Sequence, residues 1–203
     1  MFEAFSKPVH FNVFKQILDY GKDLTQLTFD GYINMEESAL TKAEEINREL
    51  AVLAEQLFSQ VKEDQELEKE EYALLLSLLG HVRKLKYNHD RLINYTRLKI
   101  NNAIFFSDMA AAELENLFQG TKDVYTHLSE LIVSKNPVLF RQIFRESDKY
   151  ELISLRVAIE HEGRLLEGIC KPQASTVYLQ ILFVFEDILW HLHTLTTELK
   201  EFS

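Results

Sequence analysis

Two side chains near the carboxyl end of the chain have the spacing of a metal site or of an ion pair. Asp187 and His191 are four residues apart, so on a helix they would lie on the same face. A carboxylate and an imidazole can both ligate a metal ion, and they can equally form a simple ion pair. The sequence favours an ion pair or two solvated side chains, and it leaves a rebuilt metal site open.

Motifs of well-known enzyme classes are missing from the sequence. It contains neither a glycine-rich phosphate loop nor a nucleophile elbow. The segment HEGRL, which begins at His161, lacks the second histidine of a zinc metalloprotease helix. No histidine follows a glutamate by three residues, so the motif of di-iron helical bundles is absent. We therefore expect no catalytic residue, no metal and no cofactor.

The remaining histidine and cysteine patterns predict structural roles. Cys170 is the single cysteine, so it can form neither an internal disulfide nor a cysteine-based zinc site. No histidine lies within a few residues of it in the sequence, and we expect it to be a small apolar residue in a loop. His127 with Glu130, and His161 with Arg164, have spacings that are ordinary on a helix surface.

Composition and charge exclude several classes of partner and location. The chain has 203 residues, of which 46% are hydrophobic, and a formal net charge of −10. An acidic surface repels phosphate backbones, so we expect no nucleic-acid partner. Every stretch of 18 residues contains a charged side chain, and the segment MFEAFSKPVHF has no apolar signal core. These features predict a cytoplasmic protein.

Basic residues cluster in one segment that follows the acidic run EDQELEKEE. Acids at the front of a helix and bases at its back complement the helix dipole, which explains the pattern without a partner. The alternative is a basic docking face. The cluster consists of Arg83, Lys84, Lys86, Arg91, Arg97 and Lys99.

Long amphipathic helices must position all of these groups. With 6 glycines and 3 prolines, the chain has little material for the turns of a β-protein. Apolar residues recur at helical spacing in six segments, which predicts an all-α fold. Short links between long helices require antiparallel neighbours. The predicted helices cover about residues 5–28, 39–61, 67–98, 108–133, 137–167 and 172–199.

Local signals predict the helix boundaries. Asp30–Gly31 is expected to form a turn, and Asn34 with Glu37 has the spacing of a capping box. Lys86 and His89 are expected to interrupt the buried stripe of the third helix. The other predicted boundary residues are Ser107 and Asn136 as N-caps, Pro137 and Pro172 at helix starts, and Gly168 after a helix end.

The run HEGRLLEGICKPQASTVYLQILFVFEDILWHLHTL resembles the carboxyl-terminal repeat of PhoU-type proteins. It is most similar to the PhoU-like domain of bacterial sodium–phosphate symporters. The string KINNAIFFSDMAAAELENLF resembles the segment between the two repeats of that family, and the resemblance covers about residues 15–200. The residues that match in the first run are His161, Arg164, Leu165, Gly168, Cys170, Pro172, Glu186, Ile188 and His191.

The resemblance implies one PhoU-like domain over residues 1–203, built from two pseudo-repeated three-helix bundles at about residues 5–100 and 107–201. It implies a non-enzymatic adaptor that modulates phosphate uptake or signalling through a protein partner, either a phosphate transporter or a sensor kinase. Membrane association would then be peripheral and through that partner, and a homodimer is compatible with the sequence. The alternatives are a helical interaction bundle unrelated to phosphate and a metal-dependent protein.

Members of the family bind iron or zinc through acids spaced four residues apart on the second and third helices of each repeat. Here Trp190 stands where the acid after Glu186 belongs. In the first repeat a cation, Arg83 or Lys84, stands at such a position and would repel a metal ion. The resemblance therefore predicts the fold of the family for this chain but not its metal site. The other pair positions hold Arg83 and Tyr87 or Lys84 and Asn88, Ala43 and Asn47, and Asp148 and Leu152.

The faces of the third helices form the functional surface in that family. Cations and an aromatic side chain in place of the acids suggest a surface converted from ion binding to protein docking, because arginine and tryptophan are enriched in binding hot spots. The alternative for the aromatic side chain is packing against the fourth or fifth helix. The expected docking residues are Arg83, Lys84, Lys86, Glu186 and Trp190.

Overall fold

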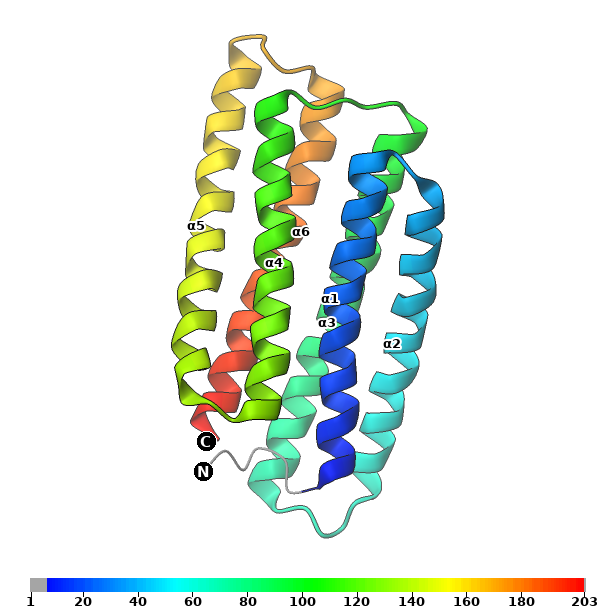
Figure 1. The fold of residues 1–203 in the computed structure, drawn as a ribbon, viewed down its shortest axis with the longest axis vertical. Helices are drawn as coiled ribbons and strands as arrows, with labels where there is room; N and C mark the ends of the chain where they lie inside the picture. The colour runs from blue at the N-terminus through cyan, green and yellow to red at the C-terminus, as the bar shows by residue number, and fades with distance from the viewer. Residues whose placement is uncertain (1–6, 203) are drawn as a thin grey trace.

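The computed structural model describes residues 7–202, and within this range the chain forms six α-helices and no strand (Figure 1). The all-α prediction is confirmed. None of the helices between residues 7 and 202 is both long enough and apolar enough to cross a membrane. The helices are α1 (Pro8–Asn34), α2 (Glu37–Glu63), α3 (Lys69–Asn101), α4 (Asp108–Ser134), α5 (Pro137–Leu166) and α6 (Pro172–Glu201).

The first helix ends later than predicted, and its predicted start at residue 5 lies outside the described residues. The turn predicted at Asp30–Gly31 is wrong, because both residues are helical. Gly31 instead permits close helix packing, since a Cβ there would lie 2.6 Å from Cδ2 of Leu40. The chain reverses at Met35, which has a φ of 54° and donates its N–H to the carbonyl of Gly31. Asn34 is thus the last residue of α1, and the predicted capping box is wrong.

The boundaries of the later helices follow the local signals. Ser107 accepts a hydrogen bond from the N–H of Ala110, and Asn136 accepts one from Val138. Pro137 and Pro172 begin α5 and α6. Gly168, with a φ of +72°, ends the turn after α5 in a conformation that favours glycine. These predictions are confirmed.

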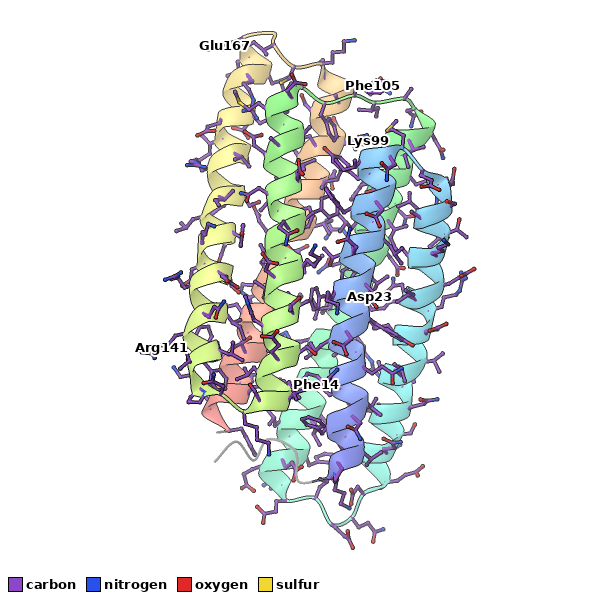
Figure 2. The ribbon with its side chains drawn as sticks, in the orientation of Figure 1. Phe14, Asp23, Lys99, Phe105, Arg141 and Glu167 are labelled. Atoms are coloured by element: carbon purple, nitrogen blue, oxygen red, sulfur yellow. The ribbon has the colours of Figure 1, made fainter. Side chains whose placement is uncertain are left out.

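The six helices share one hydrophobic core. Helix α1 packs against α2, α3 and α4, and α6 packs against α3, α4 and α5. Among the described helices, α2 touches only α1 and α3, and α5 touches only α4 and α6, so these two form opposite edges (Figure 1). Phe14 is one of the inward side chains (Figure 2). The core draws on every helix, for example through Phe14, Leu57, Leu78, Phe118, Ile143 and Phe185.

The third helix is buried where the sequence predicted an interruption. His89 is fully buried, and its Nε2 lies 2.9 Å from the hydroxyl oxygen of Tyr125 in α4. Burial lowers the pKa of His89 to about 3, so the imidazole is neutral in the folded protein. The buried stripe of α3 therefore continues through a histidine, because a partner on another helix satisfies one of its nitrogens.

Candidate functional site

The five predicted docking residues do not share one surface, and two of them turn toward α2. Arg83 forms an ion pair with Glu55 at 3.0 Å. Lys86 pairs with Asp90 of its own helix, and the other oxygen of Asp90 accepts a hydrogen bond from Nδ2 of Asn47 at 2.6 Å. Both cations are therefore engaged on the α2 side of α3.

Glu186 turns toward the opposite edge of the molecule. Its Oε1 accepts a hydrogen bond from the hydroxyl of Ser154 in α5 at 3.0 Å. Burial raises the pKa of Glu186, while the hydrogen bond from Ser154 opposes this shift. The carboxyl group belongs to the α5–α6 contact, so it does not extend a surface with the cations of α3.

The other basic residues of the cluster hold helices together. Arg97 lies between Glu37 and Glu44 of α2, at 3.0 and 2.6 Å. Lys99 is buried, with its Nζ 3.3 Å from the carbonyl oxygen of Tyr32 and 4.8 Å from the centre of that ring. Burial lowers the pKa of Lys99. The segment is therefore a set of contacts between helices and not one continuous basic face.

Lys84 and Trp190 remain together on what we call the α3/α6 face. Arg91 of α3 and Asp187 of α6 join the two helices there by an ion pair at 2.6 Å. Tyr87 is 58% exposed and Trp190 is 52% exposed. On each helix the side chains are three to four residues apart, so they share one side. The α3/α6 face consists of Lys84, Tyr87, Arg91, Phe183, Asp187 and Trp190.

Trp190 does not pack against α4 or α5 in the way that the alternative required. Its ring centre lies 6.0 Å from that of His81 in α3 and 4.8 Å from that of His191 in its own helix. About half of the side chain faces solvent. One side of the indole ring therefore contacts the imidazoles of His81 and His191, and the rest of it is exposed to solvent.

The two imidazoles beneath Trp190 contact each other. The Nδ1 atoms of His81 and His191 are 2.9 Å apart, and Nε2 of His81 lies 3.4 Å from Glu198. A hydrogen bond between two ring nitrogens needs a lone pair on one of them, so it is lost when both rings are protonated. Of the alternatives for Asp187 and His191, the ion pair between them is wrong, because Asp187 binds Arg91 instead.

We expect this histidine pair to make the stability of the fold depend on pH. Burial, together with the charges of His81 and Lys84, lowers the pKa of His191 from 6.5 to about 4, against the opposing effect of Asp187. The unfolded chain therefore binds a proton that the folded chain rejects, and stability falls as the pH decreases from 6.5 toward 4. Because the ring is partly solvated, we expect a slope below ~0.7 kcal/mol per pH unit.

Urea unfolding between pH 7 and pH 4 measures this slope. His191→Gln should flatten the profile, and His193→Gln, on the same helix but away from the pair, is the matched control. Equal flattening by both variants would show that His191 is not the group responsible.

The positions that correspond to the metal-binding acids are occupied by other contacts. The side-chain Nδ2 of Asn47 donates to Asp90 and to the carbonyl oxygen of Lys86. Across residues 7–202, no three histidine, cysteine, aspartate or glutamate side chains are grouped so that they could hold a metal ion. That the protein carries no metal stays a prediction from the sequence.

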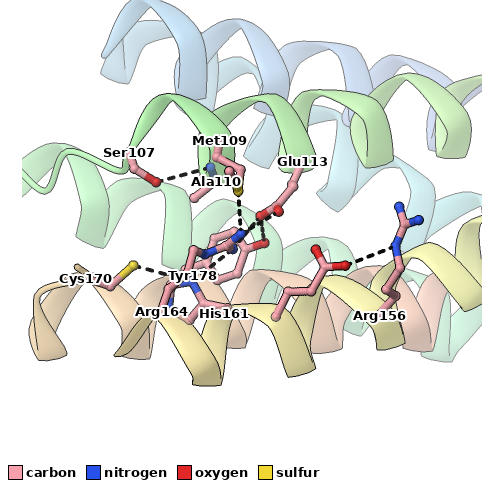
Figure 3. Close-up of polar contacts among 10 residues, drawn as sticks. Ser107, Met109, Ala110, Glu113, Arg156, His161, Arg164, Cys170 and Tyr178 are labelled. Carbon is pink, nitrogen blue, oxygen red and sulfur yellow. Dashed lines mark hydrogen bonds and ion pairs between the residues drawn. The ribbon is translucent and has the colours of Figure 1, made fainter. Parts of the chain in front are cut away.

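Three of the residues that carry the resemblance to the family motif, His161, Arg164 and Cys170, meet at one end of the bundle (Figure 3). Arg164 binds Glu113 of α4 through two nitrogens, at 2.9 and 2.8 Å, and the hydroxyl of Tyr178 in α6 donates to the same carboxylate. His161 stacks on Tyr178 with ring centres 4.3 Å apart. Its Nδ1 lies 4.0 Å from Sγ of Cys170.

This cluster, which we call the α4–α6 clamp, corrects one prediction. His161 is buried and not a surface residue. It is nine residues from Cys170 in the sequence, and the fold brings the two side chains together. Burial and the charge of Arg164 lower the pKa of His161. Glu113 could have been found from the sequence, because it stands in the second string that resembles the family. Tyr178 stands likewise in the first such string.

The remaining predicted surface pair is also rearranged. His127 does not pair with Glu130; its Nδ1 lies 2.8 Å from Glu146 of α5.

Comparison of the chain with models of known protein families, with curated proteins and with solved structures finds no match in any of the three. The resemblance to PhoU-type proteins therefore stays a prediction from the sequence.

Proposed function

We propose that this chain is a cytoplasmic, non-enzymatic adaptor of the PhoU-like type, which docks on a phosphate transporter or a sensor kinase through its α3/α6 face. The resemblance in sequence supplies the link to phosphate. Part of the proposal is that α1–α3 and α4–α6 are two repeats. The packing supports this, because the three helices within each half all contact one another in both halves.

The observation that carries the docking proposal is the pair of exposed aromatic side chains on the α3/α6 face. Tyr87 and Trp190 lie within four residues of the ion pair of Arg91 with Asp187, one on each helix. Tryptophan, tyrosine and arginine are the residue types that most often dominate binding energy at protein interfaces. The ion pair and the two imidazoles restrict these side chains before binding, which lowers the entropic cost of association.

Replacing Trp190 by alanine tests this surface. We expect the Trp190→Ala variant to bind its partner roughly 30-fold more weakly, as for a hot spot of about 2 kcal/mol. Its stability should change little, because half of the indole is exposed. The measurement is capture of partners from native membranes and lysate, followed by titration with the captured protein. Phe105→Ala, at a 73% exposed aromatic outside the face, is the matched control.

The outcome also separates the two functions that the sequence left open. Capture of a phosphate transporter or its kinase, lost in Trp190→Ala and retained in Phe105→Ala, supports the adaptor. Capture of proteins unrelated to phosphate would favour the alternative, an interaction bundle outside phosphate signalling. Equal capture by both variants would contradict docking through the α3/α6 face.

A further inference from the structure

The outer face of α5 carries an apolar stripe that the other described helices leave uncovered. The α5 stripe consists of Leu152, Leu155, Ile159 and Leu166, whose spacings of three, four and seven residues are those of a coiled-coil interface. Leu152 is 68% exposed, Ile159 71% and Leu166 90%. Within residues 7–202, α5 packs only against α4 and α6 and lies at one edge of the bundle (Figure 1). The exposure of the four side chains places the stripe on its outer side.

The stripe is not a general property of an edge helix. Helix α2 has the equivalent place at the opposite edge, and on its described surface Val52 is the one large apolar side chain that is exposed. Its other outward positions are polar, for example Glu45, Glu55 and Gln56. If contact with water alone determined the outward side chains of α5, they would be polar like those of α2. The apolar stripe therefore indicates a partner.

The charges beside the stripe indicate what that partner is. Arg141 and Arg145 lie in the amino-terminal half of the face, and Glu162 and Glu167 lie in its carboxyl-terminal half and just after it, all exposed. The exposed charges of opposite sign, Asp148 and Arg156, are paired within the chain with His193 and Glu160. The helix dipole favours the opposite order, with acids first and bases last. The order is instead complementary to a second α5 that runs antiparallel to the first.

We propose that two copies of this chain associate through their α5 helices in antiparallel orientation, with the twofold axis between Leu152 and Leu155. Arg145 and Glu162 are each about 13 Å from this axis along the helix, at 1.5 Å per residue. The twofold operation therefore places Arg145 of each copy opposite Glu162 of the other, and Leu152 opposite Leu155. Such a self-complementary patch is what a twofold interface requires.

The exposed area of the four apolar side chains is by itself too small for a stable dimer, so the charged side chains beside the stripe must also be buried. Four side chains with these exposures present about 500 Å², which is at the upper end of apolar patches on monomers. A stable interface buries roughly 800 Å² per copy, and the flanking arginine and glutamate side chains can supply the difference. The α3/α6 face lies on other helices, so this proposal does not depend on the proposed function.

The test is the mass of the full chain in solution as a function of concentration, measured by analytical ultracentrifugation. The chain of 23.8 kDa should reach twice that mass at micromolar concentrations. The double variant Leu152→Lys and Ile159→Lys should remain a monomer with unchanged helicity, because both side chains are exposed. Val52→Lys on α2 is the control and should dimerise like the unmodified chain.

Charge reversal tests the orientation. Arg145→Glu or Glu162→Arg alone should weaken the dimer roughly tenfold, because each change creates two repulsive contacts across the axis. The two changes combined should restore it. A chain that is monomeric at every concentration, or a dimer that the lysine variant leaves intact, would overturn the interface. Failure of the combined variant to recover would overturn the antiparallel arrangement.

Discussion

Arg164→Met is expected to lower the free energy of unfolding by about 3 kcal/mol, because it leaves the charge of Glu113 buried and without its cation. Both side chains are 12% exposed, and two nitrogens of Arg164 bind the carboxylate. After the substitution, the hydroxyl of Tyr178 would be the remaining donor to Glu113 in the clamp. Urea unfolding at pH 7, followed by circular dichroism, measures the loss.

The matched control is Arg156, which lies on the same helix as Arg164 and is drawn beside the clamp in Figure 3. Arg156 forms an exposed pair with Glu160 at 3.7 Å. Arg156→Met should therefore cost less than ~0.5 kcal/mol. Equal losses for the two methionine variants would show that the clamp contributes no more than a surface pair.

A double variant separates the buried charge from lost packing. Glu113→Gln removes the charge and keeps an acceptor for the hydroxyl of Tyr178. Combined with Arg164→Met, it should recover most of the lost stability, since replacing both members of a buried ion pair by neutral groups costs far less than removing one. No recovery would mean that packing of the arginine side chain, and not its charge, stabilises the clamp.

Gly21→Ala is expected to destabilise the protein by roughly 2 to 3 kcal/mol, although alanine is the better helix former. A Cβ at Gly21 would lie 2.2 Å from Cε1 of Tyr125 and 2.5 Å from its Cζ. The ring is buried and its hydroxyl lies 2.9 Å from Nε2 of His89, so it cannot move aside without breaking that hydrogen bond. Thermal and urea unfolding both measure the effect.

A second glycine supplies a control of the opposite sign. Gly80 is inside α3, and a Cβ there would have no neighbour within 4 Å. Gly80→Ala should therefore stabilise the chain by up to ~1 kcal/mol. In a Tyr125→Leu background, the penalty of Gly21→Ala should become small, because the aromatic ring that opposes the methyl group is gone. A penalty that persists would exclude the steric explanation.

The proposed docking surface was only partly predictable from the sequence. The sequence identified the third helix of each half, and Lys84 and Trp190 do lie together on the α3/α6 face. It did not reveal that Arg83 and Lys86 are engaged toward α2 or that Glu186 binds Ser154. On one helix, residues one or two positions apart point in different directions, so their final neighbours depend on which helices surround them.

The sequence by itself determined the helices and the later boundaries, because those signals act over a few residues. Ser107 and Asn136 bond to N–H groups three and two positions ahead. The tertiary structure alone decided which polar groups meet in the interior. Arg164 and Glu113 are 51 residues apart, and His81 and His191 are 110 apart. Their contacts depend on how far each helix is rotated and shifted against its neighbours, and packing of the shared apolar core sets those values.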